Sequence, residues 1–146
     1  MFTKLISALK ATRRTIVFTE GPDARILEAT DRLLKEDLMD VILIGNEAEV
    51  KAAAETGNFC ICKATIIDPM HAPQFDDYAA TYYELRKKKG ITPEQARDTM
   101  TDATYFGTMM VKKDDADGMV SGSINTTAHT IRPAFEFVKT KPGFSV

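Results

Sequence analysis

Short apolar runs alternate with amphipathic stretches along most of this chain. Residues 15–18, 41–44 and 64–68 are rich in β-branched side chains and are closed by turn signals, so these segments are predicted to be strands. A shorter run at residues 118–120 is predicted to be a fourth strand. A strand that is hydrophobic at every position requires cover on both faces, which is typical of a parallel sheet.

The segments between these strands carry helical periodicity. An apolar stripe predicts a helix over residues 22–36, with Pro22 at its first position. Thr92 and Gln95 are spaced as a capping box, which predicts another helix start. Further helices are expected at residues 2–10, 47–55, 73–89 and from 101 onward.

Four strands that alternate with helices, without hairpin turns, predict the α/β class, namely a three-layer α/β/α fold with a mainly parallel sheet. Ligands of such sheets bind beyond the carboxyl ends of the strands. The turns at Gly21 and at Ser121 and Gly122 both follow a predicted strand. We therefore expect the functional site at this edge of the sheet.

The second of these turns leads into a predicted helix. Residues 121–123 are small, and Asn125, Thr126 and Thr127 are all good N-capping types. A helix that begins directly after such a turn presents unpaired N–H groups and the positive end of its dipole, which favours phosphate binding. Arg132, two turns later, can clamp the same anion with its planar guanidinium group. An ordinary polar turn between strand and helix is the alternative interpretation.

Pro133 interrupts the helical stripe next to Arg132. Proline removes a backbone hydrogen bond and disfavours helical geometry in the residue before it. We therefore expect either a kinked helix, or a helix that ends near Arg132 followed by one that starts at Pro133. Either distortion is expected to aim Arg132 towards Ser121. His129 has no catalytic partner at a recognisable spacing and is interpreted as a surface histidine of this helix.

A second arginine is predicted on an apolar helix face. Within residues 73–89, Arg86 shares a stripe with Phe75, Tyr78 and Tyr82. Its side chain can run along the apolar surface to solvent, near the negative end of the helix dipole. Alternatively, the stripe carries Arg86 into a cleft where it meets an anion.

Length and charge narrow the function classes. The 146 residues suffice for one sizeable core, and a net charge of −2 with interspersed signs excludes the electrostatic footprint of a nucleic-acid or anionic-membrane binder. No glycine-rich dinucleotide or nucleotide motif is present in the sequence. Residues 2–10 are too short and too charged for a signal peptide or a membrane span, and are interpreted as a docking helix.

The two cysteines, Cys60 and Cys62, are separated by one residue. Redox pairs and zinc half-sites both favour two intervening residues. These cysteines are therefore interpreted as reduced residues that fill the core of a cytoplasmic protein.

Six motifs, taken together, closely resemble those of the phosphate acetyltransferases (phosphotransacetylases). They lie at residues 16–20 with Arg25, and at 41–46, 83–90, 105–110, 117–122 and 126–133. The resemblance implies two α/β domains of the isocitrate- and isopropylmalate-dehydrogenase-like type with the active site in the cleft between them. Residues 1–140 would then be an incomplete first domain, and residues 141–146 the start of a connection to the second.

The resemblance also implies a function. Family members reversibly transfer an acetyl group between coenzyme A and phosphate, without a metal or a tightly bound cofactor. The resemblance transfers anion-binding roles to Arg25, Arg86 and Arg132, and it places Ser121 and Thr126 at the cleft. A homodimer formed through the second domain and a cytoplasmic location are expected, with small-molecule substrates and neither nucleic acid nor membrane as partners.

The chain departs from the family pattern in three places. Asp114 stands where the family has glycine, and Ser123 where many members have alanine; both are small changes at turns. The chain stops at Val146, whereas the family continues into a part that carries an aspartate base, a serine–arginine pair and a cleft cysteine. We therefore expect this chain alone to be inactive. A phosphate butyryltransferase and a non-catalytic, acyl-CoA-binding regulatory domain of the same family remain as alternatives.

Overall fold

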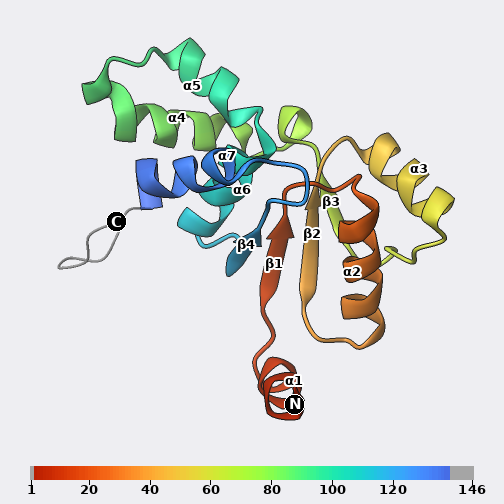
Figure 1. The fold of residues 1–146 in the computed structure, drawn as a ribbon. Coiled ribbons are helices and arrows are strands. Elements are labelled where there is room, and N and C mark those ends of the chain that lie inside the picture. Colours follow the sequence, from red (N-terminus) through yellow and green to blue (C-terminus); the bar gives the residue numbers. More distant parts are fainter. Residues whose placement is uncertain (1, 139–146) are drawn as a thin grey trace.

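The computed structural model of the chain describes residues 2–138, which contain one parallel sheet with helices on both faces (Figure 1). Its strands are arranged in the order β3-β2-β1-β4. Their bounds are Thr15–Phe18 for β1, Asp40–Ile44 for β2, Thr65–Ile67 for β3 and Gly118–Val120 for β4. All three pairings are parallel, so the predicted α/β fold and its sheet type are confirmed. The predicted connection at residues 141–146 lies outside the described residues.

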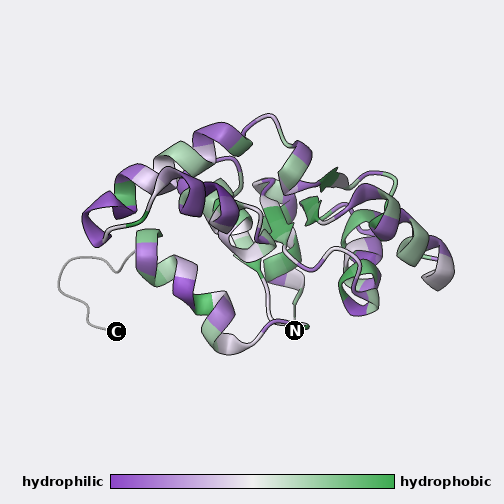
Figure 2. Ribbon diagram, turned by 90° about the horizontal axis from the view of Figure 1, so that it is seen from above, coloured by the Kyte–Doolittle hydropathy of each residue, from purple (hydrophilic) through white to green (hydrophobic). Residues whose placement is uncertain are grey.

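The three layers follow from the alternation of side chains along the two central strands. Val17 and Ile44 point to one face of the sheet and join one buried cluster, whereas Phe18 and Leu43 join a second cluster on the opposite face. Both clusters are covered by helices, and the apolar positions gather along the strands between them (Figure 2). This double cover explains why the strands read as continuous apolar runs.

Two helices cover the Phe18 face, and most of the others cover the Val17 face. The first group comprises α2 (Ala24–Lys35) and α3 (Glu47–Gly57). The second comprises α4 (Phe75–Arg86), α5 (Pro93–Met100) and α6 (Ala103–Lys112), with short 3-10 turns η1 (Pro69–His71) and η2 (Lys87–Lys89) flanking α4. A further helix, α7 (Thr127–Pro133), packs on α6. Within residues 2–138 no helix is both long enough and apolar enough to cross a membrane.

Local capping explains where two of these helices begin. The capping box of α5 is confirmed, since Gln95 N–H donates to Thr92 Oγ1 at 3.2 Å and Thr92 N–H donates to Gln95 Oε1 at 2.9 Å. The prediction that α2 starts at Pro22 is wrong. Asp23 is the N-cap of α2 and accepts from the backbone N–H of Arg25, so Pro22 belongs to the preceding turn.

The first helix, α1 (Thr3–Ala11), stands apart from the layers at the amino-terminal end of β1 (Figure 1). None of its residues is buried against the rest of residues 2–138, and Phe2 and Leu5 are 65% and 55% exposed. The helix itself is confirmed, and its interpretation as a docking helix stays a prediction.

Close packing after β1 yields a first prediction. The N–H of Gly21 donates to the carbonyl oxygen of Ile44 at 3.0 Å, and a Cβ on Gly21 would lie only 2.7 Å from that same oxygen. We expect Gly21→Ala to lower the free energy of unfolding by about 1–3 kcal/mol, because backbone must move to admit the methyl group. Urea unfolding measures this. In the matched control Gly118→Ala, the new Cβ would meet only the flexible end of Ile16, so equal losses in both variants would contradict the argument.

Candidate functional site

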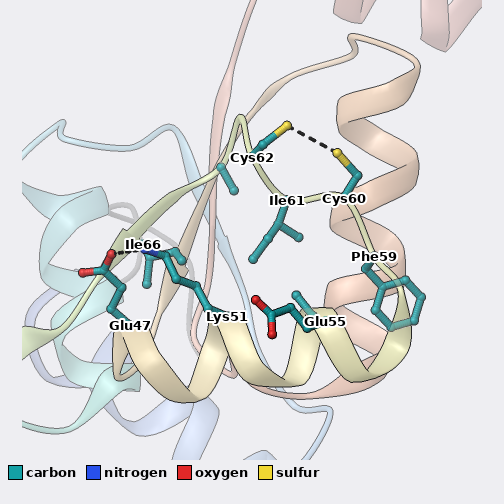
Figure 3. Close-up of a pocket in the computed structure, with 10 residues that line it drawn as sticks. Glu47, Lys51, Glu55, Phe59, Cys60, Ile61, Cys62 and Ile66 are labelled. Atoms are coloured by element: carbon teal, nitrogen blue, oxygen red, sulfur yellow. Dashed lines mark hydrogen bonds and ion pairs between the residues drawn. The ribbon is translucent and has the colours of Figure 1, made fainter.

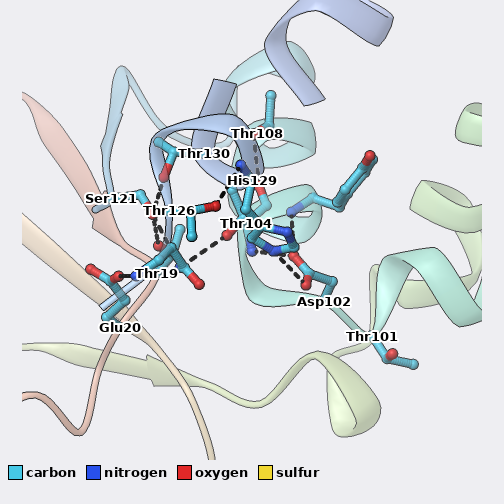
Figure 4. Close-up of polar contacts among 12 residues, drawn as sticks. Thr19, Glu20, Thr101, Asp102, Thr104, Thr108, Ser121, Thr126, His129 and Thr130 are labelled. Atoms are coloured by element: carbon cyan, nitrogen blue, oxygen red, sulfur yellow. Dashed lines mark hydrogen bonds and ion pairs between the residues drawn. The ribbon is translucent and has the colours of Figure 1, made fainter. Parts of the chain in front are cut away.

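The candidate site lies at the carboxyl edge of the sheet, where β1 and β4 are neighbours. The turn that follows β1 and the turn that follows β4 contact each other there, because Thr19 Oγ1 donates to Ser121 Oγ at 2.7 Å (Figure 4). The two turns that the sequence placed at strand ends therefore form one site.

Glu20 is the central group of this site, and sequence reasoning missed it. Its side chain is buried, with 6% of the residue exposed. Oε2 accepts from the backbone N–H groups of Gly122 (3.2 Å) and Ser123 (2.8 Å), and Oε1 from those of Ile124 and Asn125 (both 2.7 Å). Burial acts to raise the pKa of Glu20, but the hydrogen bonds from these four backbone N–H groups outweigh it and lower the pKa below the ordinary value.

This arrangement corrects the predicted anion site. The N–H groups of the turn after β4 were expected to be unpaired and to bind phosphate, but the Glu20 carboxylate occupies them. The helix also begins later than expected, at Thr127, with Thr126 as its N-cap: Thr126 Oγ1 accepts from the backbone N–H of His129 at 3.2 Å. The turn is thus held in shape by an internal carboxylate.

Ser121 is the side chain that this turn positions most closely. Donors from three different segments surround its hydroxyl oxygen: Thr19 Oγ1 at 2.7 Å, Asn125 Nδ2 at 3.4 Å and Thr130 Oγ1 at 3.5 Å (Figure 4). Asn125 Nδ2 also donates to Thr104 Oγ1 at 3.3 Å, which connects the group to α6. A serine hydroxyl has two acceptor positions and one O–H donor, so Ser121 can accept from Thr19 and still donate to a ligand oxygen.

A histidine–aspartate pair lies at the Thr104 end of this network. His129 Nε2 lies 2.9 Å from Asp102 Oδ2, and Asp102 Oδ1 caps α6 by accepting from the backbone N–H groups of Thr104 and Tyr105. The His129 side chain is 41% exposed, so it is at the surface as predicted, but its partner was missed. Asp102 and His129 are 27 residues apart in sequence, and their contact joins the amino-terminal ends of α6 and α7.

Arg25 reaches the turn after β4 from the start of α2. Its Nη2 donates to the carbonyl oxygen of Ser123 at 2.7 Å and to Asp23 Oδ2 at 2.9 Å. The Arg25 hydrogen bond is the main reason that the pKa of Asp23 falls to about 2. The structure therefore brings Arg25 to the predicted site, where part of its guanidinium group is engaged by Asp23 and part of its side chain is exposed.

Arg86 lies at the end of α4 against a group of aromatic side chains. Its Nη2 is 3.7 Å from Glu136 Oε1, and Tyr82 donates to the other oxygen of Glu136 at 2.7 Å. The Arg86 side chain is 25% exposed, and its Nε is buried without a hydrogen-bond partner among residues 2–138. Burial is the larger cause that raises the pKa of Tyr82, and the hydrogen bond to Glu136 is the second. Arg86 thus meets an internal carboxylate and keeps one polar atom unsatisfied.

Arg132 is exposed on α7, and no hydrogen bond or ion pair joins it to residues 2–138. Burial and the charge of Glu136 raise the pKa of Tyr105 to about 12, and the charge of Arg132 acts in the opposite direction. The α7 residue that contacts Ser121 is Thr130 rather than Arg132, so the expected aim of Arg132 towards Ser121 is not seen.

The helix is distorted at Pro133 as predicted, but by a change of helix type rather than by a kink or a new α-helix. The α-helix ends at Pro133, and the chain continues as the π-helical turn η3 (Ala134–Val138). Pro133 cannot donate the backbone hydrogen bond of a regular helix, so the change in helix type falls at this residue. It brings Glu136 to Tyr82 and buries Phe137.

A separate hollow of about 510 Å³ lies between α3 and the loop that leads to β3 (Figure 3). Ile61 and Lys51 line it, and Cys60 and Cys62 are at its rim. Both cysteines are exposed, which overturns the prediction that they fill the core. The reason is that they follow α3 in a loop that ends before β3 begins, where neither layer of helices covers them.

Comparison with known proteins places this structure in a family. A profile of the family described as phosphate acetyl/butaryl transferase matches residues 1–146. A phosphate acetyltransferase from Nitratidesulfovibrio vulgaris is 55% identical over 142 residues, which cover 97% of this chain and 20% of that protein. A phosphate acetyltransferase from Thermoanaerobacterium thermosaccharolyticum is 49% identical over the same share of this chain and 43% of its own length.

Solved structures agree with this relationship. The EutD phosphotransacetylase from Staphylococcus aureus matches with a TM-score of 0.89 and 35% identity, over 99% of this chain and 45% of that one. A phosphotransacetylase from Streptococcus pyogenes matches with a TM-score of 0.89 and 39% identity, over 100% of this chain and 45% of that one. The chain thus spans between a fifth and less than half of the length of these relatives. Because sequence and fold agree along the whole chain, it belongs to the phosphate acetyl/butaryl transferase family.

Proposed function

We propose that this chain is the N-terminal portion of a phosphate acetyltransferase, which reversibly transfers an acetyl group between acetyl-CoA and phosphate. The observation that carries the proposal is the identity of 55% and 49% to two proteins that are both named phosphate acetyltransferase. In this proposal residues 1–140 are the first of two domains, and the complete enzyme is a cytoplasmic homodimer that holds coenzyme A as a substrate.

The reaction places two demands on the protein. The thiolate sulfur of coenzyme A bonds to the carbonyl carbon of acetyl phosphate, and the bond from that carbon to the phosphate oxygen breaks. Negative charge develops on the carbonyl oxygen and on the leaving phosphate, and fixed donors that meet this charge lower the barrier. The anionic substrates also need cationic partners in the ground state.

Three arginines and two hydroxyl groups are proposed to meet these demands. Arg132 has a guanidinium group that no residue in the described part of the chain engages, and Arg86 has a buried Nε without a partner there. Arg25 stands beside the turn that holds Ser121. We assign substrate binding to Arg25, Arg86, Arg132, Ser121 and Thr126, and assign the base to the remainder of the full-length enzyme.

The test compares this chain with the full-length enzyme that contains it. Acetyl-CoA formation is measured with acetyl phosphate and coenzyme A, and butyryl phosphate is tested in parallel. We expect turnover of acetyl phosphate by the full-length enzyme and no measurable turnover by the 146-residue chain, because half of the cleft and the base would be absent. Turnover by the chain at the full-length rate would contradict the assignment of the base to the remainder.

Two other results would replace the proposed activity. Faster turnover of butyryl phosphate than of acetyl phosphate would identify a phosphate butyryltransferase. Binding of acetyl-CoA by the full-length protein without any acyl transfer would identify a regulatory domain of the same family.

A further inference from the structure

Cys60 and Cys62 form a pair of exposed thiols in the loop between α3 and β3. Their Sγ atoms are 3.3 Å apart and point to the same side of the loop (Figure 3). They are the only two cysteines of the 146 residues. Two sulfur atoms in contact at the surface can react with each other without a large movement of the backbone.

The loop is held in the conformation that brings these sulfur atoms together. The backbone N–H of Cys60 donates at 3.0 Å to Asp31 Oδ1, and Asp31 is a buried residue of α2. On the other side of the pair, the N–H of Ala64 donates to the carbonyl oxygen of Ile61 at 2.9 Å and closes a turn. Both ends of the three-residue segment are thus fixed by hydrogen bonds.

Lysine side chains lie beside the pair. The sulfur-bearing residues line a small hollow of about 140 Å³ together with Leu34, Lys35 and Lys63. Cationic side chains beside a thiol stabilise its ionised form. The contact with the Cys62 sulfur atom is the main cause that lowers the pKa of Cys60; of the nearby charges, Asp31 opposes this shift and Lys35 adds to it. The same contact raises the pKa of Cys62. The lowered pKa favours Cys60 as the first thiol to attack, and the 3.3 Å contact places Cys62 to follow.

We propose that Cys60 and Cys62 are a redox-active dithiol, which exchanges with small disulfides and closes to an intramolecular disulfide. The Cys60 thiolate attacks one sulfur of the small disulfide, whose S–S bond breaks and releases one thiol after protonation. Cys62 then loses its proton and attacks Cys60 Sγ, and the second thiol leaves with that proton. In total, two protein thiols are oxidised to one disulfide, and one small disulfide is reduced to two thiols.

The chain geometry permits this ring closure. Cα atoms two residues apart are separated by at most about 7 Å in an extended chain, so those of Cys60 and Cys62 cannot lie farther apart than this. Disulfides bridge Cα separations of about 4.4–6.8 Å. Disulfides that are exposed exchange readily with small thiols, so the modification is expected to be reversible.

The experiment treats the reduced protein with glutathione disulfide, quenches with an alkylating agent and identifies the products by intact and peptide mass spectrometry. We expect the protein to become lighter by two hydrogen atoms, with both cysteines protected from alkylation on one peptide, and dithiothreitol to restore both thiols. Protein that keeps two alkylatable thiols, or that forms only disulfide-linked dimers, would overturn the proposal.

Single serine variants assign the two roles, and both positions are exposed, so the fold can be verified by circular dichroism. Cys62→Ser is expected to stop at a stable mixed disulfide between Cys60 and glutathione. Cys60→Ser removes the partner sulfur atom, so it is expected to stop at a mixed disulfide on Cys62 without losing two hydrogen atoms. Absence of a mixed disulfide in Cys62→Ser would overturn the assigned attack by Cys60. None of these measurements depends on the proposed transferase activity.

Discussion

Glu20→Ala is expected to lower the free energy of unfolding by about 3–5 kcal/mol, the largest loss of stability that we predict for a single side chain at this site. The Glu20 carboxylate is the acceptor for four consecutive backbone N–H groups in the turn after β4. Its removal leaves these donors without a partner in a partly buried turn, where water can replace only some of the bonds. For a domain of this size the melting temperature should fall by roughly 10–20 °C.

A second variant shows that the carboxylate, rather than the size of the side chain, is responsible. In Glu20→Gln one of the two oxygens becomes an NH₂ group, which places donors against two backbone N–H groups. We therefore expect a loss comparable to that of Glu20→Ala. The control Glu55→Ala replaces an exposed glutamate of α3 and should change stability by less than about 0.5 kcal/mol. Stability of both Glu20 variants close to the wild type would contradict the structural role of this carboxylate.

The pH dependence of this effect has a defined sign. The folded state lowers the pKa of Glu20 below the ordinary value of 4.5, so the unfolded state binds its proton more readily. The contribution of Glu20 is therefore complete above pH 4.5 and is lost as the pH falls through the lower pKa of the folded state. Urea unfolding of the wild type and of Glu20→Ala should show a stability difference that is constant near neutral pH and shrinks in acid.

The role of Glu20 also shows where sequence reasoning reached its limit. The strands were predictable because each is a continuous apolar run, and the helix start at Thr92 because its side chain is a good cap. Both turns of the site were placed at strand ends. Their contact, however, depends on β1 and β4 being neighbours in the order β3-β2-β1-β4, which no local pattern contains. Without that order, a glutamate in one turn cannot be assigned to the N–H groups of another.

Other misses have the same cause. Asp102 and His129 are 27 residues apart, and only the packing of α7 on α6 brings their side chains to 2.9 Å. The exposure of Cys60 and Cys62 depends on which strand ends the helices leave uncovered. Pro22 was misplaced by two competing local signals, since proline favours the first helical position and Asp23 favours the N-cap; the aspartate determined the start of α2. Local chemistry thus predicts elements and their ends, whereas the site requires their arrangement.

Arg132→Ala in the full-length enzyme is expected to lower kcat/KM by about 30- to 1,000-fold, which corresponds to about 2–4 kcal/mol of lost transition-state stabilisation. The reason is that the three arginines differ in whether an acidic side chain engages them. Asp23 engages Arg25, and Glu136 lies 3.7 Å from Arg86, whereas no acceptor among residues 2–138 engages Arg132. An exposed guanidinium group without an internal partner is suited to receive a substrate anion.

The structure also predicts that this loss is separate from folding. Because Arg132 makes no hydrogen bond or ion pair within the described chain, Arg132→Ala should change the free energy of unfolding by less than about 0.5 kcal/mol. Arg132→Lys keeps the charge but lacks the planar fork, so it should retain intermediate activity, and added guanidinium ions should partly restore Arg132→Ala. The matched control is Arg32→Ala, which removes an exposed arginine on α2 that pairs with Glu28, and should leave kcat/KM unchanged. A fall in melting temperature with unchanged kcat/KM per folded molecule would show that Arg132 is structural and would remove it from the proposed site.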